Sequence, residues 1–232
     1  HCTNRLIMEY FCGANSRLCS DRYASRDCVT FCLAVANAFT TPEGLDFVML
    51  ELDRAPAAGL NLALWASLPC TAGTPWYRLN QKYAGARDKH AAHLATFHKL
   101  MDNFMILAER VVTLNGDLHW EWPTHCELWK DPKVQHMLQY FSMHTVNLHG
   151  CALGLTSAAD GRPIKKPWTV ATTSVNMHSA FKSALCPGTG PHREHAQCAG
   201  AETRRTEEYT DAFADLVHEA ILQDTMDISG AA

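Results

Sequence analysis

Residues 62–79, LALWASLPCTAGTPWYRL, decide the fold and contain the first candidate for chemistry. The apolar run 62–68 predicts a buried parallel strand, because strands covered on both faces are continuously apolar rather than alternating. The run ends at Pro69-Cys70, and a loop rich in Thr, Gly and Pro follows. Ligands of open α/β sheets bind beyond the carboxyl ends of the strands, so we expect Cys70 at that edge. The alternative role for Cys70 is that of a small apolar residue in the core.

Length and composition bound the remaining interpretation. A chain of 232 residues can form one α/β core with a small appendage. The net charge of −4 excludes a globally basic protein, so contact with nucleic acid would need a local patch. Neither a membrane-spanning apolar run nor a signal peptide is visible, and the first residue, His1, suggests a segment of a longer polypeptide. The ten scattered cysteines favour a reducing, intracellular compartment, nuclear or cytoplasmic.

The pattern along the chain predicts an α/β fold with a doubly wound, mostly parallel, Rossmann-like sheet. We expect helices from Thr41 to about Asp53 and over 85–114, 131–140 and about 207–223. We expect strands over residues 5–11, 28–35, 62–68, 117–122, 143–149 and 167–173. The last two strands are predicted to pair antiparallel at one edge. Residues 1–180 would form this domain, and 181–232 a Cys/His-rich loop and a helix packed on it.

The loop after residue 185 has the composition of a metal site. Cys186, His192, His195 and Cys198 fall within the thirteen residues CPGTGPHREHAQC. Zinc prefers tetrahedral sets of Cys and His, and the short gap between His195 and Cys198 matches common ligand spacing. Because four ligands from one short loop would be cramped, Cys151 or Cys126 is a possible replacement for one of them. A polar loop without metal is the alternative.

Three motifs occur in order along the predicted sheet: LIMEYFCGANSRL at the first strand, SLPCT at Cys70, and HWEWP around Glu121. Together they resemble the DNA (cytosine-5)-methyltransferase family. The first is similar to that family's cofactor loop, the second to its Pro-Cys nucleophile motif, and the third to its Glu-containing motif. GRPIKKPWTVATT resembles the family's late basic stretch less closely. The resemblance covers about residues 5–173.

This resemblance implies an S-adenosylmethionine-dependent methyltransferase acting on a cytosine in nucleic acid, with DNA as the expected partner. Cys70 would be the nucleophile and Glu121 the acid. The cofactor would lie against Phe11, Cys12, Gly13, Ala14, Asn15 and Pro69. The substrate would lie against Thr71, Trp76, Arg78, Arg162, Lys165 and Lys166, although a solvated helix start for Arg78 and a core position for Trp76 are the plainer alternatives.

The chemistry itself favours these residue types. Addition of a thiolate at carbon 6 of a pyrimidine makes carbon 5 nucleophilic, and cysteine is both a strong nucleophile and a good leaving group. An acid near ring nitrogen 3 stabilises the charge that builds there. A base inside a duplex would also have to be flipped into the pocket. Trp122-Pro123 follows Glu121 where the family has Asn, so we expect the Cys70 loop to be supported differently.

Two other functions remain open at this stage. The chain can be a catalytically silent α/β module, stabilised by zinc, that binds nucleic acid or a protein partner. It can also be a thiol hydrolase that pairs Cys70 with one of its thirteen histidines, but no spaced His/Asn partner supports this interpretation.

Overall fold

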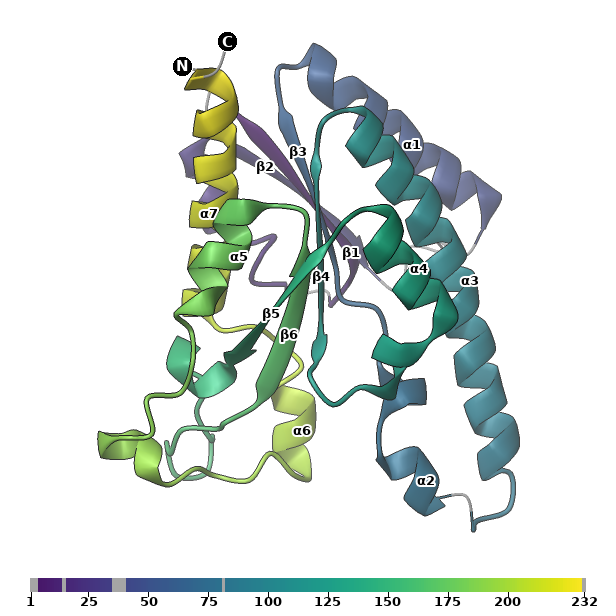
Figure 1. The fold of residues 1–232 in the computed structure, drawn as a ribbon, viewed down its shortest axis with the longest axis vertical. Helices are drawn as coiled ribbons and strands as arrows, with labels where there is room; N and C mark the ends of the chain where they lie inside the picture. The colour runs from purple at the N-terminus through teal and green to yellow at the C-terminus, as the bar shows by residue number, and fades with distance from the viewer. Residues whose placement is uncertain (1–3, 14–15, 35–40, 81, 231–232) are drawn as a thin grey trace.

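The computed structural model describes residues 4–13, 16–34, 41–80 and 82–230, without some side chains, those of Trp76 and Arg78 among them (Figure 1). Its strands are β1 (Arg5–Cys12), β2 (Cys28–Ala34), β3 (Asn61–Ala66), β4 (Asp117–Pro123), β5 (His144–His149) and β6 (Pro167–Thr172). Its helices are α1 (Pro42–Ala57), α2 (Trp76–Asn80), α3 (Ala86–Thr113), α4 (Pro132–Tyr140), α5 (Val175–Lys182), α6 (Ala201–Arg205) and α7 (Asp211–Gly230).

The strands form one mixed sheet in the order β2-β1-β3-β4-β6-β5. The first four are parallel neighbours, and β6 runs antiparallel to both β4 and β5. The predicted α/β class, with a mostly parallel sheet and an antiparallel edge, is therefore confirmed and is compatible with a Rossmann-like fold. Because β1 pairs with β2 on one side and β3 on the other, the topological switch point lies between β1 and β3.

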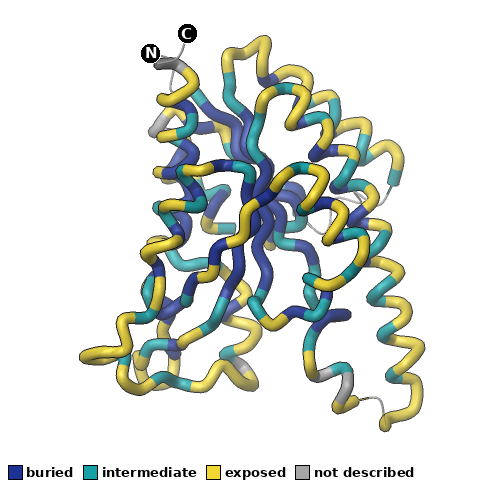
Figure 2. Tube along the Cα trace, viewed as in Figure 1, coloured by how far each residue is buried: buried dark blue, intermediate teal, exposed yellow. Residues whose placement is uncertain are grey.

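Helices cover both faces of this sheet (Figure 1). Leu64 of β3 belongs to a core that includes residues of α1, α3 and α4. The next residue, Trp65, belongs to the opposite core, with Phe181 of α5 and Phe213 of α7. Figure 2 shows the buried strands between helices whose outer faces are exposed. Covering both faces explains why β3 is continuously apolar in the sequence.

Helix α1 begins where the sequence predicts and ends later. The Oγ1 atom of Thr41 accepts a hydrogen bond from the N–H of Gly44, so Thr41 is the N-cap. The helix was expected to end near Asp53, but it continues to Ala57 and contains Pro56 in its last turn. Its end is set instead by Gly59, whose φ of 70° allows Leu60 N–H to reach the carbonyl of Ala55.

The C-terminal helical region also differs from the prediction of one helix over 207–223. A short helix, α6, comes first, and the long helix α7 runs from Asp211 to Gly230. The Oγ1 atom of Thr210 accepts from the N–H of Phe213 and so sets the start of α7. The prediction that this helix packs on the domain agrees with the burial of Phe213, Val217 and Ile221.

The other predicted elements are confirmed to within a residue or two at each end, whereas α5 was not expected. Ser174 caps α5 by accepting from the N–H of Met177. A membrane-spanning segment was not expected, and none of the helices described is both long and apolar enough to cross a bilayer.

Candidate functional site

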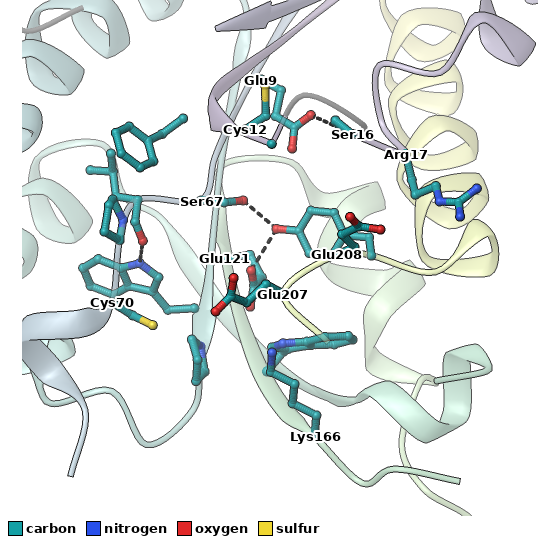
Figure 3. Close-up of a pocket in the computed structure, with 18 of the residues that line it drawn as sticks. Glu9, Cys12, Ser16, Arg17, Ser67, Cys70, Glu121, Lys166, Glu207 and Glu208 are labelled. Atoms are coloured by element: carbon teal, nitrogen blue, oxygen red, sulfur yellow. Dashed lines mark hydrogen bonds between the residues drawn. The ribbon is translucent and has the colours of Figure 1, made fainter. Parts of the chain in front are cut away.

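A pocket of about 510 Å³ opens at the carboxyl ends of β1, β3 and β4 (Figure 3). It lies at the topological switch point, where open α/β sheets bind their ligands. Its volume falls in the range of small-molecule and cofactor sites. Cys70 and Glu121 both line it. The three motifs that are separate in sequence therefore meet at one cavity.

The first-strand loop forms one wall of this pocket. Phe11, Cys12 and Gly13 line it, and Pro69, which follows the neighbouring strand β3, lines the same pocket. Phe11 has a φ of 70°, a conformation that is costly for an aromatic residue and that is found preferentially at functional sites. The pairing of β1 with β2 becomes irregular at the same point, between Tyr10 and Cys12.

Gly13 leaves open space where a side chain would stand. Apart from the chain neighbours of Gly13, no atom of the described residues lies within 4 Å of the position that its Cβ would occupy. A ligand can therefore approach the backbone here without displacing protein atoms. The other two predicted cofactor residues, Ala14 and Asn15, lie outside the described residues.

Cys70 is held on a short, tightly packed turn. Its carbonyl accepts a hydrogen bond from the N–H of Gly73 at 2.9 Å, within a 3-10 helix over Thr71–Gly73. A Cβ on Gly73 would lie 2.6 Å from the Sγ of Cys126 and 2.8 Å from the amide nitrogen of Leu128. Only glycine therefore fits at position 73 without displacing its neighbours.

Trp122 supports the strand end that precedes Cys70. Its Nε1–H donates to the carbonyl of Leu68 at 2.6 Å, and the ring is buried. The Cys70 loop is thus supported by Trp122, at the position where the methyltransferase family has Asn. The predicted substrate contact Thr71 also lines the pocket.

Glu121 reaches the pocket from β4 and is 7 % exposed. Its Oε2 accepts from the hydroxyl of Tyr209 at 2.8 Å, and that hydroxyl lies 2.5 Å from the Oγ of Ser67 (Figure 3). Its Oε1 is buried and has no hydrogen-bond partner among the described residues. Burial raises the pKa of Glu121 from 4.5 to about 7, against the opposing effects of Tyr209 and Lys166. Glu121 can therefore exchange a proton near neutral pH.

The thiol of Cys70 is electrostatically linked to the same carboxyl. Burial raises its pKa most, the negative charge of Glu121 raises it further, and Lys166 lowers it. Figure 3 shows Cys70, Glu121 and Lys166 around one cavity. This arrangement keeps the resting thiol protonated and makes its reactivity depend on the charge of its neighbours.

The predicted basic residues divide into two groups. Lys166 lines the pocket and donates to the carbonyl of Thr206 at 2.5 Å. Arg162 and Lys165 are not among the residues that line it, and Arg162 pairs instead with Asp160. The side chains of Trp76 and Arg78 lie outside what the structure describes.

A second candidate site lies in the C-terminal loop. Cys151, Cys186, His192 and His195 place their ligand atoms within 4.8 Å of one another, a group that can hold a metal ion. Cys186 Sγ lies 3.4 Å from His195 Nε2 and 3.9 Å from His192 Nδ1. Cys198, the fourth ligand favoured from the sequence, is not in this group: its Sγ lies 3.1 Å from Thr206 Oγ1. Cys151, which the sequence offered as a replacement ligand, takes its place in this group. It lies in the short helix Gly150–Leu153 directly after β5, and this helix lies beside the C-terminal loop.

The sequence did not reveal three parts of these sites. Tyr209 bonds to Glu121, and Ser67 to Tyr209, only through the tertiary fold, and no spacing signal links either residue to Glu121. Cys19 and Cys32 gather near Glu9 at the ends of β1 and β2. Their thiols form hydrogen bonds with each other and with Cys12, which lower the pKa of Cys32 to about 4. The excess of cysteines in the first 32 residues is the only signal that could have indicated this group.

In comparisons with known proteins, no family model, curated protein or solved structure matches the chain.

Proposed function

We propose that this chain is an S-adenosylmethionine-dependent methyltransferase that acts on carbon 5 of a pyrimidine, cytosine in nucleic acid, through a covalent adduct with Cys70. One observation carries the proposal: a cysteine and a buried carboxyl with a free oxygen face the same pocket at the topological switch point. The resemblance of LIMEYFCGANSRL, SLPCT and HWEWP to the cytosine-5 methyltransferases supports it.

The pocket suits the cofactor in size and shape. Its volume of about 510 Å³ is adequate for a nucleoside-sized ligand, and the open space at Gly13 allows close approach to the first-strand backbone. Phe11, Gly13 and Pro69 would hold the cofactor. When bound, S-adenosylmethionine supplies an electrophilic methyl group.

Cys70 and Glu121 then divide the chemistry on the base. The Sγ of Cys70, once deprotonated, bonds to carbon 6, and the electrons of the carbon 5–carbon 6 double bond make carbon 5 nucleophilic. The Oε1 of Glu121 would face ring nitrogen 3 and donate a proton as charge builds there. Methyl transfer to carbon 5 would leave S-adenosylhomocysteine. Solvent water would then take the carbon 5 proton, the double bond would re-form as the thiolate leaves carbon 6, and Glu121 would take back the proton from nitrogen 3.

The test is adduct formation with an oligonucleotide that contains 5-fluorocytosine, in the presence of the methyl donor. Fluorine replaces the proton that must leave carbon 5, so the adduct accumulates. Wild type is expected to form a covalent complex and Cys70→Ser none. Cys198→Ser, which removes an exposed thiol outside the pocket, is the matched control. Absence of an adduct in wild type, together with no binding of S-adenosylmethionine, would refute the proposal.

The C-terminal group supports a structural zinc, which we propose as part of the same protein. A thiolate and an imidazole bound tetrahedrally to zinc lie about 3.6 Å apart, given the usual bond lengths. The two Cys186–His distances, 3.4 and 3.9 Å, bracket this value. Cys151, Cys186, His192 and His195 would be the ligands.

This group also favours the second candidate function, a catalytically silent module that zinc stabilises and that binds nucleic acid or a protein partner. The two functions are separated by calorimetry with S-adenosylmethionine. Stoichiometric zinc without binding of the methyl donor supports the silent module. Binding that Gly13→Asp removes supports the methyltransferase, because a carboxylate at position 13 would project into the open space described above.

A further inference from the structure

Three potential ligands converge where β1 and β2 end: Glu9, Cys19 and Cys32. Their ligand atoms lie within 4.8 Å of one another. Cys12 lies beside this group, because the thiols of Cys12, Cys19 and Cys32 shift one another's pKa. Glu9 is 3 % exposed and Cys12 is 3 % exposed.

The backbone brings these side chains together for identifiable reasons. Glu9 and Cys32 are register partners in the parallel pair β1–β2, so their side chains lie next to each other on one face of the sheet. The left-handed conformation of Phe11 interrupts the alternation of β1. Cys12 thereby comes near enough to Cys32 to affect its pKa. The unusual backbone of Phe11 thus serves this group as well as the pocket wall.

Ser16 completes the arrangement from the loop. Its Oγ donates to Glu9 Oε2, and it accepts from the N–H groups of Leu18 and Cys19 at 3.1 and 3.4 Å. The hydroxyl therefore orients the carboxylate and holds the turn that presents Cys19. Polar groups behind the ligands that fix their orientation are characteristic of protein metal sites.

The spacing of the ligand atoms is compatible with tetrahedral coordination. Cys19 Sγ lies 3.5 Å from Glu9 Oε2. A thiolate and a carboxylate oxygen bound to one zinc ion lie about 3.6 Å apart, and two thiolates about 3.8 Å apart, from their usual bond lengths. The sulfur atoms of Cys19 and Cys32 lie within 4.8 Å of each other, which admits the second value. A carboxylate buried among three thiols is costly unless a cation compensates for its charge.

We propose that Glu9, Cys19 and Cys32 bind a zinc ion, separate from the ion at the C-terminal group, and that Cys12, which lies beside them, supplies the fourth ligand. Three sulfur ligands select a soft or borderline metal, and the carboxylate favours zinc over copper(I) among these. The ion joins the end of β1 to the end of β2 and to the loop between them. Because Glu9, Cys12 and Ser16 line the pocket, the site forms part of its wall (Figure 3). The site does not depend on the methyltransferase proposal.

The experiment counts zinc in the full chain, purified under reducing conditions, by elemental analysis. Wild type is expected to hold two equivalents, Cys19→Ser and Cys32→Ser one each, and Cys186→Ser one. Combining Cys32→Ser with Cys186→Ser leaves none. Cys198→Ser, outside both groups, keeps two and is the matched control. Circular dichroism verifies that each variant is folded.

Replacing zinc with cobalt identifies the ligands, because thiolate-to-cobalt charge-transfer absorption grows with the number of sulfur ligands. The Cys186→Ser variant, which retains only the three-cysteine site, is expected to absorb more strongly per cobalt than Cys32→Ser. Wild type with a single zinc that Cys19→Ser and Cys32→Ser leave in place would overturn the proposal. So would a disulfide between any two of Cys12, Cys19 and Cys32 in the metal-free protein under reducing conditions. Neither result bears on S-adenosylmethionine binding.

Discussion

Cys70 and Cys32 stand near the same edge of the sheet, at the ends of β3 and β2, yet their surroundings act in opposite directions. Burial and the charge of Glu121 raise the pKa of Cys70, whereas hydrogen bonds from Cys12 and Cys19 lower the pKa of Cys32 to about 4. A thiol that neighbouring thiols stabilise as thiolate is suited to bind a metal. A thiol kept protonated beside a carboxyl is suited to react only when its neighbours change charge. Neighbours, rather than position along the sheet, determine what each cysteine can do.

The largest expected effect comes from removing the carboxyl that distinguishes Cys70. Glu121→Gln cannot donate a proton to the base, so methyl transfer is expected to fall roughly 10²–10⁴-fold, the usual contribution of general acid catalysis. The same change removes the negative charge that raises the pKa of Cys70, so alkylation of Cys70 by iodoacetamide at pH 8 should become faster. Mass spectrometry of the labelled peptide measures this. Slower alkylation in the variant would contradict the electrostatic link between the two groups.

The free energy of unfolding should depend on pH because Glu121 is buried. Its pKa is raised from 4.5 to about 7 in the folded state, so the folded chain holds a proton that the unfolded chain has lost between these values. Stability is therefore expected to fall as pH rises from 4.5 through 7, by about 3 kcal/mol at most from this group. Urea unfolding of wild type and Glu121→Gln at several pH values checks it. The difference between the two proteins should grow with pH, and a constant difference would argue against a buried, protonated carboxyl.

Gly73→Ala should distort the turn that carries Cys70 and leave the cysteine cluster at the ends of β1 and β2 unchanged. The added Cβ would lie 2.6 Å from Cys126 Sγ and 2.8 Å from a backbone nitrogen, so the turn must shift. We expect a loss of about 1–3 kcal/mol in unfolding free energy, typical of overpacking, and a marked loss of adduct formation. Zinc content should remain that of wild type. Loss of zinc from the variant would show that the two regions are coupled.

The smallest effect is expected at Lys166, the cation that opposes Glu121. Lys166→Met removes a positive charge that lowers the pKa of Cys70, so alkylation of Cys70 should slow by roughly two- to fivefold at pH 8. Arg162→Met, on a side chain that pairs with Asp160 and is not among the pocket-lining residues, is the matched control and should leave the rate unchanged. Equal effects of both variants would indicate a general charge effect rather than a local one.

Prediction from the sequence succeeded where local pattern and topology act together. A continuous apolar run marked β3, and the rule that ligands gather at strand ends placed Cys70 and Glu121 at one edge. It failed where a single capping interaction decided the outcome, as at Gly59 and Thr210. It also missed Tyr209, because a hydrogen bond across 88 residues leaves no trace in spacing.

By itself, the sequence determined the α/β class, the order of its strands and helices, and the residue types available for chemistry, because periodicity and caps are local properties. Only the tertiary structure decided which side chains share a site. It brought Cys151 rather than Cys198 to the C-terminal group, and it gathered Glu9, Cys12, Cys19 and Cys32 through strand register and the left-handed backbone of Phe11. Ligand sets and pKa values depend on distances between atoms that are remote in the chain, and only packing sets those distances.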